Sequence, residues 1–263
     1  MNKVYDLLDL NNRTALITGA AGSLGQEIAY TIAELGGNVI LVDKPGSNFT
    51  EIKNTIKNYW EVDVVCMDCD LEIEKDRTNL IDSIDKLDIL INNAAFVGDS
   101  NLDGWTTELT SQTIDTWRRA FEVNLTAAFD LSKGLCSKLE QSQNGSIINI
   151  ASIYGFSAPD YSLYKGTDMG NPAAYAASKG GLIQLTRWLA STLAPKVRVN
   201  SVSPGGILRD QPVSFISLYE NKTPLKRMAT EKDLKGIIAY LASDLSEYVT
   251  GQNLVIDGGW SIW

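Results

Sequence analysis

Apolar and β-branched residues gather in short segments that recur along the chain at fairly regular intervals. These segments cover residues 13–18, 38–42, 62–67, 87–91, 145–150, 196–202 and 253–257. Their near-continuous apolar character is typical of parallel strands that are buried on both faces. Between them lie segments with helical periodicity, such as 24–35 and 115–139. The alternation predicts a single α/β domain over residues 1–263, a doubly wound parallel sheet of about seven strands flanked by helices.

The overall composition is that of a globular protein that folds in water. Of the 263 residues, 44% are hydrophobic and 21% are charged, and the formal net charge is -9. Such an acidic chain is a poor partner for nucleic acid or an anionic membrane, because binding phosphate requires a basic surface. No apolar run approaches the roughly 20 residues that span a bilayer, and the amino-terminal residues lack a signal-peptide pattern. We therefore expect a cytoplasmic protein with a small-molecule substrate.

The sequence contains no histidine and three cysteines. The absence of histidine excludes Ser-His-Asp hydrolysis, histidine-ligated zinc and histidine general-base catalysis. Cys66, Cys69 and Cys136 are too few for a disulfide framework, and Cys66-x-x-Cys69 is most simply two thiols near the end of a strand. We expect no metal site, and proton transfer must fall to Tyr, Lys, Asp, Glu or Cys.

A glycine-rich turn follows the first predicted strand and opens the next helix. Its candidate cofactor-binding residues are Gly19, Ser23, Leu24 and Gly25. Glycines let a backbone approach a pyrophosphate closely, and a helix amino terminus offers free N–H groups. A tight strand-to-helix turn without a ligand would use the same glycines, but the flanking strand and helix match the setting of a dinucleotide site.

Acidic and amide residues follow the next three strands, at the edge where such sheets bind ligands. Asp43 lies 18 residues beyond Gly25, where a carboxylate can accept hydrogen bonds from a ribose and repel a 2′-phosphate. This favours NAD over NADP, although Lys44 partly offsets the repulsion and Asp43 could instead be a solvated turn residue. Asp70 and the segment Asn93-Ala94-Ala95 would then line the adenine and ribose side of the groove.

Tyr175 and Lys179 stand at positions i and i+4 of a predicted helix, so their side chains share one face. A lysine cation there can lower the pKa of the tyrosine, with help from the positive ring of an oxidised nicotinamide. Ser152 directly follows the fifth strand, and Asn124 lies within a predicted helix. Taken singly, these residues also fit a surface pair, a turn serine and a satisfied helix amide.

Taken together and in order, these motifs resemble the short-chain dehydrogenase/reductase family over essentially the whole chain. The set comprises Thr18-Gly19 to Gly25, Asp70, Asn92-Asn93-Ala94-Ala95, Asn124, Ser152, Tyr175-x-x-x-Lys179 and Ser203-Pro204-Gly205. The resemblance implies a Rossmann-like fold and a nicotinamide cofactor held in part by Leu71, Pro204, Gly205, Ile207, Tyr175 and Lys179. It further implies that Tyr175 is the acid/base, that Lys179 lowers its pKa, that Ser152 holds the reacting oxygen and that Asn124 orders a water.

The glycine-rich turn departs from the family pattern. Ser23 occupies the usual middle glycine position, and the resulting spacing is similar to that of the extended nucleotide-sugar epimerases and dehydratases. Those relatives carry a longer carboxyl-terminal substrate region, whereas only 84 residues follow Lys179 here. We therefore favour the shorter dehydrogenase type.

Two further departures concern the substrate side. Ser152 and Tyr175 are 23 positions apart, more than is usual, which predicts a substrate-loop insertion at about 154–172 that includes Tyr154 as a substrate contact. Residues 96–117 are expected to form a second wall, and residues about 205–229 a substrate lid. In that lid Arg209 replaces a common threonine, and we hypothesise that it meets a phosphate or carboxylate; the alternative is a solvent-facing arginine.

The predicted reaction is hydride transfer between a nicotinamide cofactor and a secondary alcohol or ketone. The insertion is similar to segments of relatives encoded with bacterial surface-polysaccharide and flagellin-glycosylation genes, which implies a sugar or activated amino-sugar substrate. Two alternatives are a nucleotide-sugar lyase or epimerase with tightly held NAD and a non-catalytic NAD-binding protein. The family resemblance implies a homodimer or homotetramer through the helices 115–139 and 172–194. The apolar residues 256–263 should pack on the core or on a neighbouring subunit.

Overall fold

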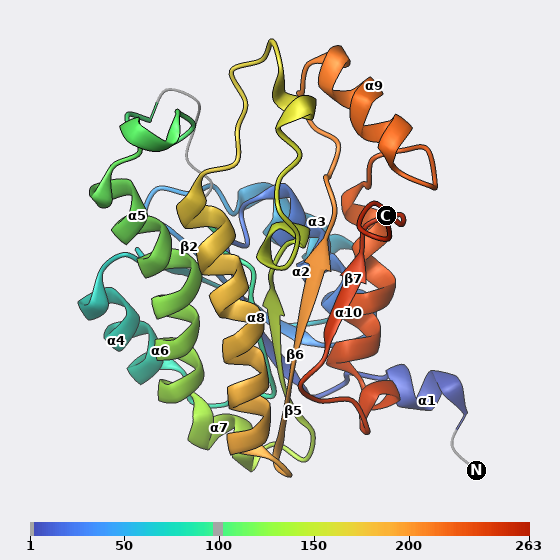
Figure 1. The fold of residues 1–263 in the computed structure, drawn as a ribbon. Helices are drawn as coiled ribbons and strands as arrows, with labels where there is room; N and C mark the ends of the chain where they lie inside the picture. Colours follow the sequence, from blue (N-terminus) through green and yellow to red (C-terminus); the bar gives the residue numbers. More distant parts are fainter. Residues whose placement is uncertain (1–2, 97–101) are drawn as a thin grey trace.

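A computed structural model describes residues 3–96 and 102–263, and its centre is a parallel sheet (Figure 1). Within these residues the sheet has seven strands in the order β3-β2-β1-β4-β5-β6-β7, and every neighbouring pair is parallel. The strands are β1 (Thr14–Thr18), β2 (Asn38–Asp43), β3 (Val64–Asp68), β4 (Ile89–Asn92), β5 (Gly145–Ile150), β6 (Val197–Pro204) and β7 (Asn253–Ile256). The predicted doubly wound sheet is confirmed. Chain order reverses between β1 and β4, the place where such sheets bind ligands.

Helices cover both faces of the sheet. On one face pack α2 (Ser23–Glu34), α3 (Thr50–Tyr59) and α10 (Lys235–Ala242). The other face is covered by α4 (Glu74–Ser83), α6 (Ala127–Gly134), α7 (Cys136–Gln141) and α8 (Ala173–Leu193), with α5 (Ile114–Phe121) packed on α8. Successive strand residues alternate between the two cores, as Leu16 and Ile17 show. The buried strands are therefore apolar on both faces, which explains their continuous hydrophobic runs.

The remaining elements are short. They are α1 (Val4–Leu8), α9 (Val213–Lys222), the 3₁₀ turns Leu109–Ser111, Ile153–Gly155, Tyr161–Tyr164, Glu231–Leu234 and Asp244–Ser246, and a π-helical segment, Glu122–Thr126. No helix among the described residues is long and apolar enough to cross a membrane.

The helix predicted over 115–139 is interrupted twice. Residues 122–126 form a π-helical segment, which adds a residue to the turn that contains Asn124. The helix is interrupted again between α6 and α7, where Gly134 lies so close to Ile81 that a Cβ on the glycine would collide with the isoleucine side chain. Periodicity alone could not show either interruption, because both arise from contacts with residues remote in the sequence.

The predicted insertion and lid meet above the carboxyl edge, the edge of the sheet formed by the carboxyl ends of the strands (Figure 1). Leu163 and Tyr164 of the insertion share a buried aromatic cluster with Phe215 and Tyr219 of α9 and with Trp260. The Lys222 ammonium forms an ion pair of 2.7 Å with Asp160, which joins the two segments from outside. Of the last residues, which we expected to pack on the core or on a neighbouring subunit, Trp260 is buried in this cluster, whereas Ile262 and Trp263 are 73% and 72% exposed.

Candidate functional site

The glycine-rich turn is shaped by two close approaches of the backbone. Gly19 has a φ of +65°, and a Cβ there would lie 2.8 Å from Cα of Ala94. A Cβ on Gly25 would overlap the carbonyl oxygen of Gly19, so only glycine lets α2 begin this close to β1. Ser23 and Leu24 are the first two residues of α2, so their backbone N–H groups are among those that a helix start leaves free. The turn therefore has the construction of a phosphate cradle.

Thr18 and Asn93 fasten this turn to the end of β4. The Thr18 hydroxyl accepts hydrogen bonds of 3.1 Å from the backbone N–H groups of Asn93 and Ala94. The Asn93 amide in turn donates to the carbonyl oxygens of Thr18 and Gly19, at 3.0 and 3.1 Å. Asn93 thus supports the turn through its side chain, and these hydrogen bonds join the carboxyl ends of β1 and β4.

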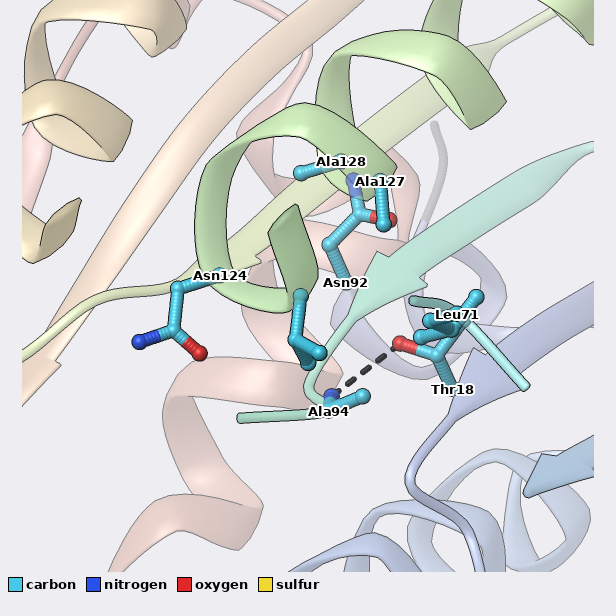
Figure 2. A pocket seen from close by; sticks show the side chains of 8 residues that line it. Thr18, Leu71, Asn92, Ala94, Asn124, Ala127 and Ala128 are labelled. Carbon is cyan, nitrogen blue, oxygen red and sulfur yellow. Dashed lines mark hydrogen bonds between the residues drawn. The ribbon is translucent and has the colours of Figure 1, made fainter. Parts of the chain in front are cut away.

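A small cavity lies between β4 and the π-helical segment (Figure 2). Its volume is about 10 Å³, the space of roughly one water molecule. It is lined by Thr18, Leu71, Asn92, Ala94, Val123, Asn124, Ala127 and Ala128. In Figure 2 the amide group of Asn124 points away from Thr18. Its hydrogen-bond partners are Phe96 and Ser178.

Asp43 lies where the sequence predicts a ribose contact, at the end of β2. Its carboxylate accepts hydrogen bonds from the N–H groups of Ala21 and Lys44, at 2.9 and 2.8 Å, and from the hydroxyl of Ser47 at 3.1 Å. The bond from Ala21 brings the carboxylate directly to the glycine-rich turn. A group held beside the phosphate cradle is in the right place to select between cofactors.

Asp70 and Leu71 follow β3. The Asp70 carboxylate accepts from the N–H of Glu72 at 3.0 Å, and the Leu71 side chain is buried in the core. The carbonyl oxygen of Leu71 accepts a hydrogen bond of 2.6 Å from Arg77, whose guanidinium also pairs with Asp130 of α6. These contacts fix the loop after β3 next to the cavity that Leu71 helps to line.

Tyr175, Ser152 and Lys179 come together at the carboxyl edge. Tyr175 and Lys179 lie one turn apart on α8, with the Lys179 Nζ 5.8 Å from the centre of the Tyr175 ring. Ser152 follows β5, where its hydroxyl accepts a hydrogen bond of 3.2 Å from the N–H of Tyr154 and lies near enough to Tyr175 to oppose the rise of the pKa of that phenol. The buried Lys179 ammonium donates a hydrogen bond of 2.7 Å to the carbonyl oxygen of Ile150. The predicted trio is therefore assembled by the contact of α8 with β5.

Burial dominates the protonation of this trio. It raises the pKa of Tyr175 above its usual value, and the hydrogen bond with Ser152 opposes that rise. It lowers the pKa of Lys179 to about 8. The lowering of the tyrosine pKa that we expected from Lys179 is not produced by this placement of the chain's own groups, because the ammonium bonds to Ile150 and not to the phenol. A further positive charge near Tyr175 would be needed.

Asn124 joins three parts of the site from its π-helical segment. Its Oδ1 accepts a hydrogen bond of 2.6 Å from the N–H of Phe96, and its Nδ2 donates to the hydroxyl of Ser178 at 3.0 Å. Ser178 in turn donates to the carbonyl oxygen of Tyr175 at 3.0 Å. Both halves of the amide are used by the chain, so Asn124 positions α8 and the end of β4. Among the described residues, no hydrogen bond joins Asn124 with Lys179.

The loop after β6 begins with Pro204 and Gly205. Gly205 donates its N–H to the carbonyl oxygen of Ile256 at 2.9 Å, and Ile207 forms a bridge with Ala229, so both ends of the predicted lid segment 205–229 are held. Arg209 forms an ion pair with Glu231 and is partly exposed. The guanidinium that we hypothesised to meet a ligand thus has a partner within the chain, and a ligand anion would have to share or displace it.

Tyr154 begins the insertion and contacts its other tyrosine. The hydroxyl groups of Tyr154 and Tyr164 are 2.6 Å apart and share one hydrogen bond. Burial is the main cause that raises the pKa of both phenols, with a smaller contribution from Tyr175. The insertion therefore brings hydroxyl groups to the Tyr175 side of the site.

Some residues of the site were not predicted from the sequence. Ser178, Tyr164 and Glu231 have no motif of their own, and only their spatial neighbours mark them. Thr18 was named within a motif, but its role in bonding to the β4 loop depends on the register of two strands. Part of the predicted second wall, residues 97–101, lies outside the described residues, while Trp105 within that wall is buried against Ala120 and Ala174. No cluster of potential metal ligands is present among the described residues.

Comparison with known proteins identifies the class of this fold and site. Residues 19–261 match the family described as "Enoyl-(Acyl carrier protein) reductase". The chain belongs to the short-chain dehydrogenase/reductase family and is an NAD(P)-dependent oxidoreductase.

Individual relatives span nearly the whole chain. The 3-oxoacyl-[acyl-carrier-protein] reductase FabG of Rickettsia bellii is 36% identical over 266 residues, which cover 96% of this chain and 98% of that protein. A short-chain dehydrogenase from Leptospira borgpetersenii with bound NAD⁺ is 32% identical, with a TM-score of 0.83 and coverage of 99% and 96%. A putative NAD(P)-dependent gluconate 5-dehydrogenase from Beutenbergia cavernae with bound NADP is 29% identical, with a TM-score of 0.86 and coverage of 98% and 100%.

Proposed function

We propose that this oxidoreductase interconverts a secondary alcohol and its ketone, with Tyr175 as the acid/base. The observation that carries the proposal is the placement of Ser152 close to Tyr175, with Lys179 one helical turn along α8 and anchored to Ile150. In oxidation, Tyr175 takes the proton of the substrate hydroxyl while Ser152 holds the same oxygen; in reduction, Tyr175 returns the proton. A bound nicotinamide accepts or supplies the hydride. Lys179 keeps a positive charge beneath the phenol, and Asn124 holds α8 in position.

The proposed cofactor is NAD. The close backbone approaches at Gly19 and Gly25 suit a pyrophosphate, and the carboxylate of Asp43 beside Ala21 would repel a 2′-phosphate. Asp70, Leu71, Asn93, Ala94 and Ala95 would border the adenosine side, and Ser23, Leu24, Pro204, Gly205 and Ile207 would complete the groove. Solved relatives hold either NAD⁺ or NADP, so measured turnover with each cofactor decides this choice.

The proposed substrate is a sugar or an activated amino sugar. In the Tyr154–Tyr164 pair one hydroxyl donates to the other, so the accepting phenol keeps a proton that it can donate to a substrate oxygen. The names of the relatives support a second candidate, a 3-oxoacyl thioester, since several proteins at 33–36% identity are 3-oxoacyl reductases. Arg209 would contact an anionic group of either substrate, and an unchanged KM in Arg209→Ala would contradict that role.

The test combines a substrate panel with one substitution. NAD and NADP would each be tried with D-gluconate, glucose 6-phosphate, UDP-N-acetylglucosamine and acetoacetyl-coenzyme A. Tyr175→Phe should lower kcat by about 10²–10⁴-fold and leave the Kd of NADH nearly unchanged. Tyr161→Phe is the matched control, because Tyr161 lies on the predicted insertion, outside α8, and is 63% exposed. Activity retained in Tyr175→Phe would sink the assignment of the acid/base.

The panel also separates this proposal from its rivals. A lyase or epimerase that holds NAD permanently returns the hydride in each cycle, so product would form without a net change in nicotinamide absorbance. A non-catalytic NAD-binding protein would bind NADH and transform nothing in the panel. A homodimer or homotetramer remains our expectation for the assembly, to be measured by light scattering.

A further inference from the structure

Asn171 differs from the other buried asparagines among the residues that the structure describes. Asn92, Asn124, Asn149 and Asn200 all have hydrogen-bond partners within the protein. Asn171 is 7% exposed, and neither its Oδ1 nor its Nδ2 has a partner in the structure. A buried amide without partners costs about 1–3 kcal/mol, so such groups in native proteins usually serve a ligand or an ordered water.

The location of Asn171 connects this unpaired amide with the proposed reaction. It is the residue before Pro172, the N-cap of α8, and the N–H of Tyr175 bonds to the Pro172 carbonyl at 3.1 Å. Helical side chains lean toward the helix amino terminus, so the Tyr175 side chain covers the turn that Asn171 precedes. Asn171 therefore lies at the start of the helix that carries the proposed acid/base, four residues before Tyr175.

Neighbouring residues place Asn171 between the two walls of the site. Met169, two residues earlier, packs on the aromatic cluster that contains Tyr164. Gly170 lies against Thr106, with 3.7 Å between the position of a Cβ on the glycine and Cβ of the threonine. Tyr175 packs on Trp105 in the second wall. The amide is thus held where the insertion, the second wall and α8 meet.

We propose that Asn171 is a specificity-determining residue that binds a hydroxyl group of the substrate adjacent to the reacting carbon. This inference rests on the proposed function and deepens it. A carboxamide presents one acceptor oxygen and one donor nitrogen, and a hydroxyl group can satisfy both because it donates and accepts. A carboxylate, a phosphate or the carbonyl groups of a 3-oxoacyl thioester only accept, and would leave Oδ1 unpaired. Asn171 accordingly favours a polyhydroxylated substrate over an acyl chain.

The experiment compares two alcohols that differ in one hydroxyl group, cyclohexanol and cis-1,2-cyclohexanediol. The wild-type kcat/KM should be higher for the diol than for cyclohexanol. Asn171→Leu should lower kcat/KM for the diol about tenfold or more and leave kcat/KM for cyclohexanol nearly unchanged. Asn58→Leu is the control, since Asn58 is exposed on α3 across the sheet. Equal losses on both alcohols, or no loss, would overturn the inference.

A second measurement does not depend on turnover. Leucine removes two unsatisfied buried groups, so Asn171→Leu should unfold at the same temperature as the wild type or higher. A lower midpoint would mean that the amide supports the fold, and would overturn the inference. A wild type that oxidises neither these alcohols nor any compound of the earlier panel contradicts the proposed function instead, and the midpoint then still decides the role of Asn171.

Discussion

Lys179 donates its Nζ hydrogen bond to the carbonyl oxygen of Ile150, and this contact ties the middle of α8 to the carboxyl end of β5. Ser152 follows Ile150 by two residues, and Tyr175 precedes Lys179 by one helical turn. One bond between a side chain and the backbone therefore sets the separation of the serine and the tyrosine. Lys179 therefore positions Ser152 and Tyr175 relative to each other, in addition to placing a positive charge near the phenol.

The burial of Lys179 gives a prediction about stability and pH. The pKa of the folded-state ammonium is about 8, below its usual 10.5, because burial disfavours the charge. Between these pH values the unfolded chain binds more protons, so stability should rise with pH, by at most about 1.4 kcal/mol per pH unit. Urea unfolding of wild type and Lys179→Met should show that the unfolding free energy of the wild type rises relative to that of the variant as pH increases from about 7 to about 9.5. A constant difference across that range would contradict the prediction.

The glycine-rich turn allows a matched comparison of two glycines. A Cβ at Gly25 overlaps the Gly19 carbonyl, whereas a Cβ at Gly22 lies 3.4 Å from the same oxygen. Gly25→Ala should therefore destabilise the protein by about 1–3 kcal/mol and weaken NADH binding. Gly22→Ala should change stability by less than about 0.5 kcal/mol. Thermal unfolding and fluorescence titration with NADH measure both effects, and similar behaviour of the two variants would refute the proposed close approach.

The ion pair between Asp160 and Lys222 leads to a prediction about stability at low pH. The hydrogen bond from Lys222, with those from Ser162, lowers the pKa of Asp160 to about 2. The stabilisation should be present above the ordinary carboxylate pKa near 3.8 and vanish as pH falls through about 2. Because both side chains are partly exposed, Asp160→Asn should cost no more than about 1 kcal/mol at pH 7.

A double-mutant cycle with Lys222→Met isolates that pair. Lys222 also lies over the Trp260 ring at 4.4 Å, so its single substitution should have the larger effect. Unfolding free energies from pH 7 down to a pH below about 2 provide the coupling energy, because the folded carboxylate is protonated only there. A coupling that persists unchanged at the lowest pH would show that the carboxylate charge is not its source.

The sheet could be predicted from sequence because each buried strand carries its signal locally. The seven apolar runs match the strands to within about two residues at each end, and the helix of Tyr175 matches α8 closely. The interruption at residues 122–126 could not be predicted, since Asn124 leaves the regular helix to bond with Phe96 and Ser178, which are remote in sequence. Side-chain partners of this kind depend on the assembled fold.

In the candidate site, too, local sequence signals predicted some residues, whereas others depend on contacts in the assembled fold. Tyr175, Lys179 and Ser152 could be singled out by spacing, because their neighbourhood follows from the helix repeat and from strand polarity. The partner of Arg209 could not, because Glu231 lies beyond α9 and reaches the arginine only through the path of the lid. Asn171 has no motif at all, and its unpaired amide becomes visible only when every neighbour has been placed.

The aromatic cluster of Tyr164, Phe215, Tyr219 and Trp260 draws on three stretches of chain far apart in sequence, and the sheet supplies none of these rings. Each stretch is the packing surface of the other two. A graft of the insertion from a relative would therefore leave α9 and Trp260 without their complement. Redesign of substrate choice in this enzyme has to exchange residues 154–172, residues 213–222 and Trp260 together, with the cofactor-binding half left in place.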